Sequence, residues 1–224
     1  MSKIYKMRIR YKREDFLTQG AVSAAWRELV QNSGLAYARA EKINPLYPRV
    51  TFGPPLALGL ASECEFVDLY FENFAGEAEV FEKLSLAKKE GIEITGVKHI
   101  PYVFPSVASL SDAAEFYVSG FEKFNPPPLE NFLKNGVLLT VAHENGFREE
   151  IGVKPYLVNA EVSDGILKIT LRSVNGRNLR VELFLAKWLR QPALFENGVF
   201  VKHGVKIVKK NLYYQNSLGG YEVV

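Results

Sequence analysis

Cysteine is almost absent from this chain of 224 residues, which contains a single one, Cys64. One cysteine cannot form an intramolecular disulfide or a metal site built from cysteines alone. It also excludes an iron–sulfur cluster held by this chain alone, because such clusters usually need three or four thiolates. We therefore expect no cofactor.

Long apolar runs are absent as well. No segment approaches the roughly 20 apolar residues of a membrane-spanning helix. Residues 1–13 are basic and lack the apolar centre of a signal peptide. Hydrophobic residues at 47% and charged residues at 24% are ordinary for a globular protein and argue against disorder. The sequence predicts a cytoplasmic protein that does not contact a membrane.

Net charge is small, at +3, but it is unevenly distributed along the chain. Residues 1–13 carry six bases and no acid, and residues 201–224 carry four bases and one acid. The two ends together therefore hold +9, and the segment between them holds −6. A near-zero total argues against bulk affinity for nucleic acid, but local basic patches decide such binding.

The first half of the chain has the order strand, helix, strand, strand, helix, strand. Residues 4–12 alternate between apolar and basic side chains, which is typical of a strand with one basic face. Thr18 is placed to cap a helix that runs to about Gln31. Extended structure follows over 37–58 and 65–73, then a helix over 76–90 and a strand over 92–100. This order is that of a ferredoxin-like unit.

The second half repeats the same order. We expect a strand over 113–124, a helix after the three prolines 126–128, and pairing of 137–143 with 154–163 around residues 145–146. A turn at 164–165 leads into a strand over 166–173, followed by a helix over 180–189 and a last strand region over 199–214. The fold prediction is α+β, with two tandem ferredoxin-like (βαββαβ) units over residues 1–104 and 105–224.

A family resemblance rests on three stretches: Met-Arg-Ile-Arg-Tyr at 7–11, a proline-bounded segment at 44–56, and Ser-Glu-Cys-Glu at 62–65. Together they resemble the uncharacterised radical-SAM-linked family, whose members are encoded beside a radical SAM enzyme or fused to its C-terminus. Residues 112–116 and 154–156 also match that pattern. The resemblance implies a radical SAM protein as partner. The family has no established activity that could be transferred to this chain.

Two departures from the family pattern fall in its polar motifs. The family's Ser-His-Leu-Asp reads Thr-Gln-Gly-Ala at 18–21, and its Asn-Pro-His-Pro reads Asn-Pro-Leu-Tyr-Pro at 44–48. Any role that the family's two histidines and one aspartate have is therefore open for this chain. The three histidines present are scattered and do not suggest a metal site. His203, close to Lys202 and Lys206, is the best candidate for a neutral base, and no catalytic constellation is recognisable.

The segment 44–58 is the first candidate binding site. Asn44 and Arg49 are held between prolines, which restrict the backbone before any ligand arrives. Gly53 would allow close approach of a ligand to the backbone. The alternative is that Phe52 and Leu56 simply pack and that the prolines end a strand.

Basic faces of the first and last strands are the second candidate. In the first strand Lys6, Arg8 and Arg10 are predicted to project together, and near the C-terminus Lys202 and Lys206 share a parity. Two open sheet faces with such side chains would track phosphates. The alternative is that these side chains are merely solvated.

Two functions follow as hypotheses. The first is a non-catalytic accessory protein that binds or presents the substrate of a radical SAM enzyme. The second, drawn from fold analogy alone, is an RNA-binding or RNA-processing module of the tandem ferredoxin-like type. An interaction scaffold without a ligand is the third possibility.

Overall fold

The computed structural model describes residues 4–41, 44–134, 136–142, 148–196, 199–218 and 220–224. The chain divides into two compact units, which comprise residues 1–111 with Val224 and residues 112–223. The expected boundary after residue 104 is thus displaced by seven residues. The reason is local, because Pro105 and Val107 are hydrogen-bonded to side chains of the first unit. No helix in the described part of the chain is long and apolar enough to cross a membrane.

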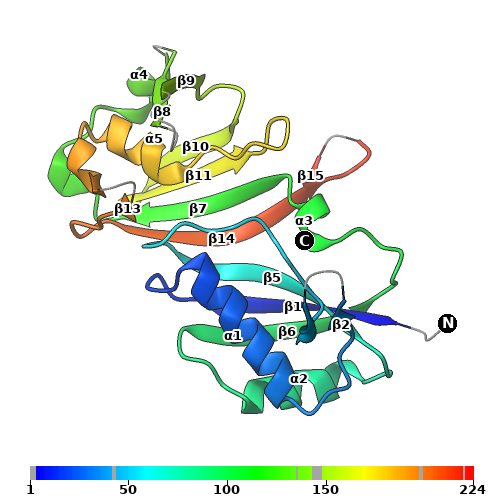
Figure 1. Ribbon diagram of the computed structural model, residues 1–224. Coiled ribbons are helices and arrows are strands. Elements are labelled where there is room, and N and C mark those ends of the chain that lie inside the picture. The colour runs from blue at the N-terminus through cyan, green and yellow to red at the C-terminus, as the bar shows by residue number, and fades with distance from the viewer. Residues whose placement is uncertain (1–3, 42–43, 135, 143–147, 197–198, 219) are drawn as a thin grey trace. The chain divides into compact units, whose positions relative to one another are not determined.

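The first unit is an antiparallel sheet with two longer helices and the short helix α3 (Figure 1). Strand β5 pairs with β1 and with β4, and β1 pairs on its other side with β6. Strands β2 and β3 form a separate hairpin. The elements are β1 (Tyr5–Arg13), α1 (Gln19–Asn32), β2 (Arg39–Ala40), β3 (Asn44–Pro48), β4 (Val50–Phe52), β5 (Ala61–Phe71), α2 (Glu77–Leu86), β6 (Ile92–Ile100) and α3 (Val107–Leu110).

Local sequence explains several of these boundaries. The hydroxyl of Thr18 accepts a hydrogen bond from the backbone N–H of Ala21 at 3.1 Å, so it caps α1 as predicted. Strand β6 has the predicted bounds. Helix α2 ends at Leu86, four residues before the predicted end. Lys88 and Gly91 both have positive φ, which a helix cannot accommodate.

The hydrophobic core of the first unit lies between the sheet and the two helices. Strand β1 contributes alternate residues to it, as its period-2 pattern predicts. Trp26 of α1 is fully buried, and its ring meets that of Tyr11 edge-on, with 5.0 Å between the centroids. The core residues of these elements include Met7, Ile9, Tyr11, Val22, Trp26, Leu29, Val67, Leu69, Phe71, Val80 and Leu84.

The second unit is also an antiparallel sheet with helices, in the strand order β10-β11-β7-β14-β15. Its elements are β7 (Ala113–Ser119), α4 (Leu129–Lys134), β8 (Leu138–Ala142), β9 (Arg148–Gly152), β10 (Leu157–Ser163), β11 (Ile166–Arg172), α5 (Val181–Trp188), β12 (Phe195–Glu196), β13 (Val199–Phe200), β14 (Lys206–Gln215) and β15 (Tyr221–Val223), with two 3₁₀ turns, Glu122–Phe124 and Pro192–Leu194. The tight turn at Asp164 and Gly165, both at positive φ, joins β10 to β11 as predicted.

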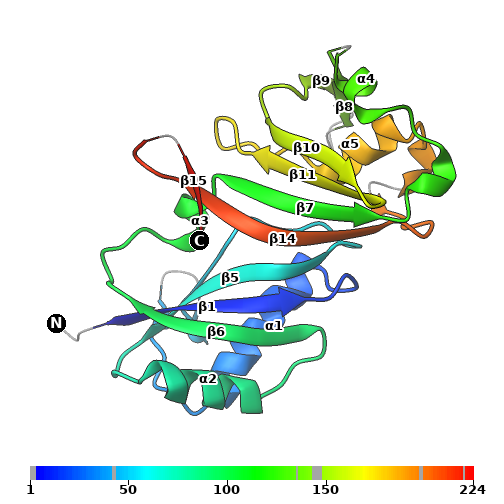
Figure 2. The ribbon, with the colours of Figure 1, turned by 180° about the vertical axis from the view of Figure 1, so that it is seen from behind.

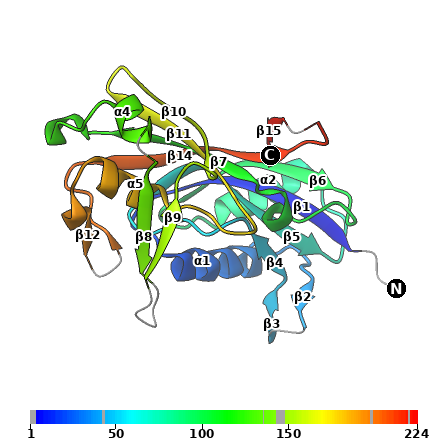
Figure 3. The same cartoon turned by 90° about the horizontal axis from the view of Figure 1, so that it is seen from above.

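One predicted pairing in the second unit is wrong. Strand β8 pairs with β9, not with the segment 154–163, and the two form a separate hairpin (Figure 3). The nearer partner requires a shorter loop, which costs less entropy to close. Segment 154–163 instead supplies β10, the partner of β11. The predicted turn at residues 145–146 lies outside the described residues.

The chain is thus a mixed α and β protein. Within the first unit, β1, α1, β4, β5, α2 and β6 follow one another in that order. Within the second, β7, α4, β10, β11, α5 and β14 do the same, with the β8–β9 hairpin inserted after α4. The assignment of both units to the ferredoxin-like fold stays a prediction.

Burial of Tyr11 makes stability depend on pH in the alkaline range. Its side chain is 2% exposed, and Glu65 lies opposite it on β5. Burial, together with the charge of Glu65, raises the pKa of Tyr11 above its ordinary value of 10.0, although the nearby Arg13 opposes this. Above pH 10 the unfolded chain therefore loses the proton while the folded chain keeps it, so the unfolded state is increasingly favoured.

We expect the Tyr11→Phe variant to lose this pH dependence. Between pH 10 and 11, the free energy of unfolding of the wild type should fall by up to about 1.4 kcal/mol more than that of the variant. Urea unfolding of both proteins from pH 8 to 11 measures the difference. Parallel curves across that range would mean that Tyr11 ionises normally.

Candidate functional site

A cavity of about 420 Å³ opens in the first unit beside α1, the β2–β3 hairpin and β4. We call it the arginine–tyrosine pocket. Its volume is at the lower end of the range for small-molecule sites, ~300–1,000 Å³. It is lined by Arg27, Arg39, Ala40, Glu41, Tyr47, Pro48, Arg49, Val50 and Phe52.

The β2–β3 hairpin gives the pocket one wall, and Figure 3 shows this hairpin next to β4. Arg39 pairs with Pro48 across the hairpin. The backbone N–H of Arg49 donates to the carbonyl of Ala38 at 2.7 Å, and Gln31 of α1 donates to the carbonyl of Leu46 at 3.1 Å. The first bond joins the two ends of the hairpin, and the second holds the hairpin against α1. The N–H of Ala38 donates to the carbonyl of Tyr70 at 2.8 Å, which ties the hairpin to β5.

Three guanidinium groups and one carboxylate line this pocket. Arg39 and Arg49 are exposed, and Arg27 is half-buried with its guanidinium 4.8 Å from the centroid of the Tyr47 ring. Glu41 is the acidic residue of the lining. The lining therefore has an excess of positive charge. Guanidinium groups bind phosphate and carboxylate through two parallel hydrogen bonds, so this lining suits an anion.

Aromatic rings hold Arg49 in place. Its guanidinium lies 4.2 Å from the centroid of the Tyr70 ring and 5.6 Å from that of Tyr102. It also donates a hydrogen bond to the Tyr102 hydroxyl at 3.1 Å. The Tyr70 hydroxyl in turn lies 3.5 Å from that of Thr51. A cation over aromatic faces is attracted to them, so Arg49 is ordered before a ligand binds.

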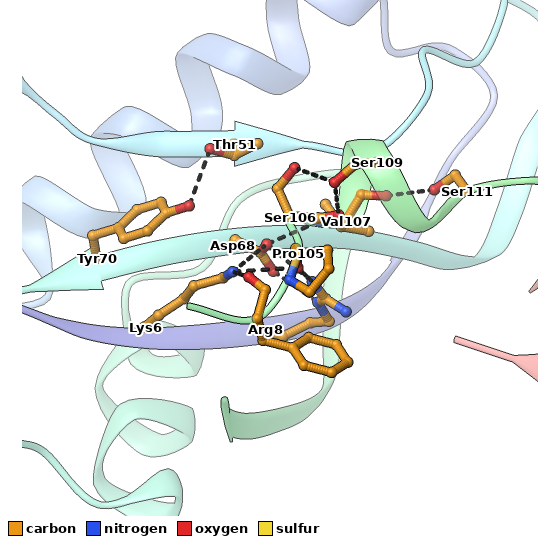
Figure 4. A network of polar contacts seen from close by, with 11 residues as sticks. Lys6, Arg8, Thr51, Asp68, Tyr70, Pro105, Ser106, Val107, Ser109 and Ser111 are labelled. Atoms are coloured by element: carbon orange, nitrogen blue, oxygen red, sulfur yellow. Dashed lines mark hydrogen bonds and ion pairs between the residues drawn. The ribbon is translucent and has the colours of Figure 1, made fainter. Parts of the chain in front are cut away.

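A buried ionic cluster lies on β1 and β5 (Figure 4). We call it the Asp68 network. Asp68 is fully buried and accepts two hydrogen bonds from Arg8, at 2.8 and 3.1 Å. It also accepts one from the backbone N–H of Val107 at 3.0 Å, and its carboxylate is 3.7 Å from the ammonium of Lys6.

The segment 104–107 closes this network. Lys6 donates to the carbonyls of Phe104 and Pro105 at 2.6 and 3.3 Å, and Arg8 donates to that of Pro105 at 3.0 Å. Two cations thus share one carboxylate. Burial lowers the pKa of Lys6, and the charges of Arg8 and Arg49 add to this, while Asp68 opposes it.

Two predicted site residues are not where the basic-face hypothesis requires them. Lys6 is 2% exposed and Arg8 9% exposed, so neither lies on an open surface. The hypothesis placed these two side chains on an open sheet face because apolar and basic residues alternate along the strand. It missed that Asp68, sixty residues later in the sequence, provides a buried counter-charge. Arg10 alone of the three is exposed.

Only part of the proline-bounded segment 44–58 lies in the pocket. Arg49 and Phe52 line the pocket, whereas the side chain of Asn44 accepts a hydrogen bond from the N–H of Leu46 at 2.9 Å and shapes the hairpin. Gly53 extends the sheet edge, where its N–H donates to the carbonyl of Phe66 at 3.2 Å. Gly53 is not part of the pocket lining.

The C-terminal candidates belong to the second unit. Lys202 and His203 precede β14 and do not lie on a strand, contrary to the predicted parity. His203 and Gly204 both have positive φ and form a turn, and the carbonyl of His203 accepts a hydrogen bond from Lys123. Lys206 is exposed at the first position of β14.

Several residues of the site carried no signal in the sequence. Arg27 is one of two charged residues of α1, and Arg39 lies in the segment 37–58, which the sequence predicts only as extended. Tyr70 and Tyr102 are separated from Arg49 by 21 and 53 residues. Only the pairing of β4 with β5, and the return of the chain after β6, bring these side chains together.

Side chains that could ligate a metal ion are dispersed over the described part of the chain. No group of three or more His, Cys, Asp or Glu side chains in that part of the chain converges on one point. Cys64, which precedes Glu65 on β5, is 1% exposed. A thiol this deeply buried behaves as a small apolar side chain.

Comparison with protein families gives one match, over residues 6–181, to the family described as "Uncharacterized protein conserved in bacteria (DUF2344)". The match spans both the pocket and the Asp68 network. Among curated proteins, none matches the chain.

Proposed function

This chain belongs to the uncharacterised bacterial family DUF2344, whose description names no activity. We propose that the protein is a non-catalytic binding protein for an anionic ligand. The ligand carries a phosphate group and a planar ring, as a nucleotide does. One observation carries the proposal, namely that three arginines line a single cavity together with Tyr47.

The geometry supports both parts of such a ligand. The guanidinium groups of Arg27, Arg39 and Arg49 match the paired oxygens of a phosphate. Tyr47, with Arg27 already against its ring, offers a flat surface for a second planar group. Because the side chain of Arg49 is packed against Tyr70 and Tyr102, less side-chain entropy is lost on binding.

Calorimetric titration with AMP and with adenosine tests this proposal. We expect AMP to bind with a Kd in the micromolar range and adenosine to bind at least about tenfold more weakly, because the nucleoside lacks the phosphate that the arginines hold. Inorganic phosphate should compete with AMP. Equal affinities for AMP and adenosine, or no heat with either, would contradict the proposal.

The accessory role is the further part of this proposal, and it rests on the sequence resemblance. In that role the bound ligand is the substrate, or part of it, of a radical SAM enzyme, and this chain presents it. A tagged copy of the protein expressed in its own bacterium should co-purify with such an enzyme. Recovery of the tagged protein without one, under conditions that preserve known complexes, would leave the ligand-binding proposal intact and remove the partner.

A further inference from the structure

A second polar surface lies on the sheet of the second unit. Among the described residues of that unit, no helix covers the face of β10, β11, β7 and β14 that Figure 2 shows in front, and α5 lies behind it. We call it the Tyr117 face. Apolar residues of the same strands, such as Val118 and Ile169, point to the opposite side and are fully buried. The Tyr117 face carries Glu115, Tyr117, Lys168, Thr170, Lys206, Val208, Lys210, Asn211 and Tyr213.

Tyr117 lies near the centre of this face, with a lysine on either side. It pairs with Lys168 of β11 and with Val208 of β14. The ammonium groups of Lys168 and Lys210 each lie 5.7 Å from the centroid of the Tyr117 ring. The register of β14 shifts between Lys209 and Asn211, and such a bulge redirects the side chain that it inserts, here that of Lys210.

The acidic residues of the face are already occupied. Glu115 accepts hydrogen bonds from Asn211 at 2.6 Å and from the hydroxyl of Tyr213 at 3.3 Å. Burial and the nearby Glu115 carboxylate raise the pKa of Tyr213, so that this hydroxyl stays protonated and continues to donate. At the β10 side, Glu161 lies 3.6 Å from Lys168. The face thus carries three lysines, Lys168, Lys206 and Lys210, against the two carboxylates, and Lys168 would exchange Glu161 for a phosphate on binding.

We propose that the Tyr117 face binds single-stranded RNA. One unpaired base stacks on the ring of Tyr117, and Lys168, Lys206 and Lys210 bind the phosphates on either side of it. An aromatic ring on an open sheet face is a platform that stacks any unpaired base. A duplex cannot use it, because the faces of its bases are already stacked.

The proposal concerns the second unit alone and does not depend on the arginine–tyrosine pocket. Fluorescence anisotropy of the full chain with labelled ten-residue oligo(U) tests it, at 50, 100 and 200 mM KCl. We expect binding whose affinity falls with salt with a logarithmic slope of about −2, as expected for roughly three phosphate contacts on a single strand. A ten-base-pair RNA duplex should bind at least about tenfold more weakly.

Variants at Tyr117 separate stacking from charge. Tyr117→Leu should weaken binding of the oligonucleotide by about tenfold, whereas Tyr117→Phe, which keeps the ring, should bind like the wild type. Lys168→Gln and Lys210→Gln should each make the affinity for the oligonucleotide depend less steeply on salt concentration. Lys154→Gln is the matched control, because Lys154 is an exposed lysine of the second unit outside this face.

Three outcomes would overturn the proposal. They are failure of the wild type to bind oligo(U) at 50 mM KCl, equal affinity for the duplex, and equal affinities of Tyr117→Leu and Tyr117→Phe. A normal circular dichroism spectrum and melting curve for Tyr117→Leu separates loss of binding from loss of folding. Binding of AMP by the same Tyr117 variants should be unchanged, so failure here leaves the proposed function standing.

Discussion

Replacing Asp68 by Asn is expected to destabilise the first unit by about 3–5 kcal/mol, because it leaves the charges of Arg8 and Lys6 buried without their counter-ion. The side chain of Asp68 is fully buried, and those of Arg8 and Lys6 are at most 9% exposed. Asparagine keeps the size of the side chain but not its charge. Hydrogen exchange of the β5 amides, together with urea unfolding, measures the loss within this unit.

The matched control is Glu93→Gln, which breaks another ion pair of β1. Glu93 lies 3.0 Å from Lys12, but both side chains are largely exposed, at 64% and 45%. Exposed pairs contribute up to about 1 kcal/mol, so this variant should unfold nearly as the wild type does. If Asp68→Asn lost no more stability than Glu93→Gln, the Asp68 network would not be the buried ionic centre described here.

Removing the three arginines of the pocket is expected to have the second large effect. In a variant with Arg27→Gln, Arg39→Gln and Arg49→Gln, AMP should bind at least about a hundredfold more weakly, since a hydrogen bond to a charged group contributes about 1.5–3 kcal/mol. Calorimetry measures the change. The melting temperature should change little, because Arg39 and Arg49 are exposed and the half-buried Arg27 is replaced by another polar side chain.

Two comparisons make this result specific. Arg10→Gln removes an exposed arginine of the same unit outside the pocket lining, and it should bind AMP like the wild type. Arg49→Lys keeps the charge but loses the planar group that packs on the Tyr70 ring and donates to the Tyr102 hydroxyl, so it should weaken binding more than Arg10→Gln does. Equal binding by all of these variants would show that charge in the pocket is irrelevant.

Much of the local structure was predictable from the sequence. The capping hydroxyl of Thr18, the bounds of β6 and the turn at Asp164 and Gly165 are set by residues within a few positions of one another. Such short-range chemistry does not depend on the rest of the fold. The apolar half of β1 was predicted for the same reason, since its alternation places Met7 and Ile9 on the core side.

Long-range partners were not predictable. The basic residues of β1 read as solvated side chains, yet Asp68 and the carbonyls of residues 104–105 bury two of them. The partner of β8 was chosen wrongly because two strand-like segments follow it, and a single sequence does not rank their pairing. Sequence alone also selected Arg49 but could not associate it with Arg27 or Arg39, since only the folded hairpin and helix bring them to one cavity.

The most direct test of the central claim is to map where AMP binds on the isotope-labelled full chain by NMR. Titration should shift the backbone amides of residues 39–41, 47 and 49–52 and the side-chain signals of Arg27, Arg39 and Arg49, all with one saturating curve. The same titration with adenosine should shift them far less. Shifts that saturate elsewhere in the chain, or none at all up to millimolar AMP, would contradict the assignment of the arginine–tyrosine pocket as the ligand site.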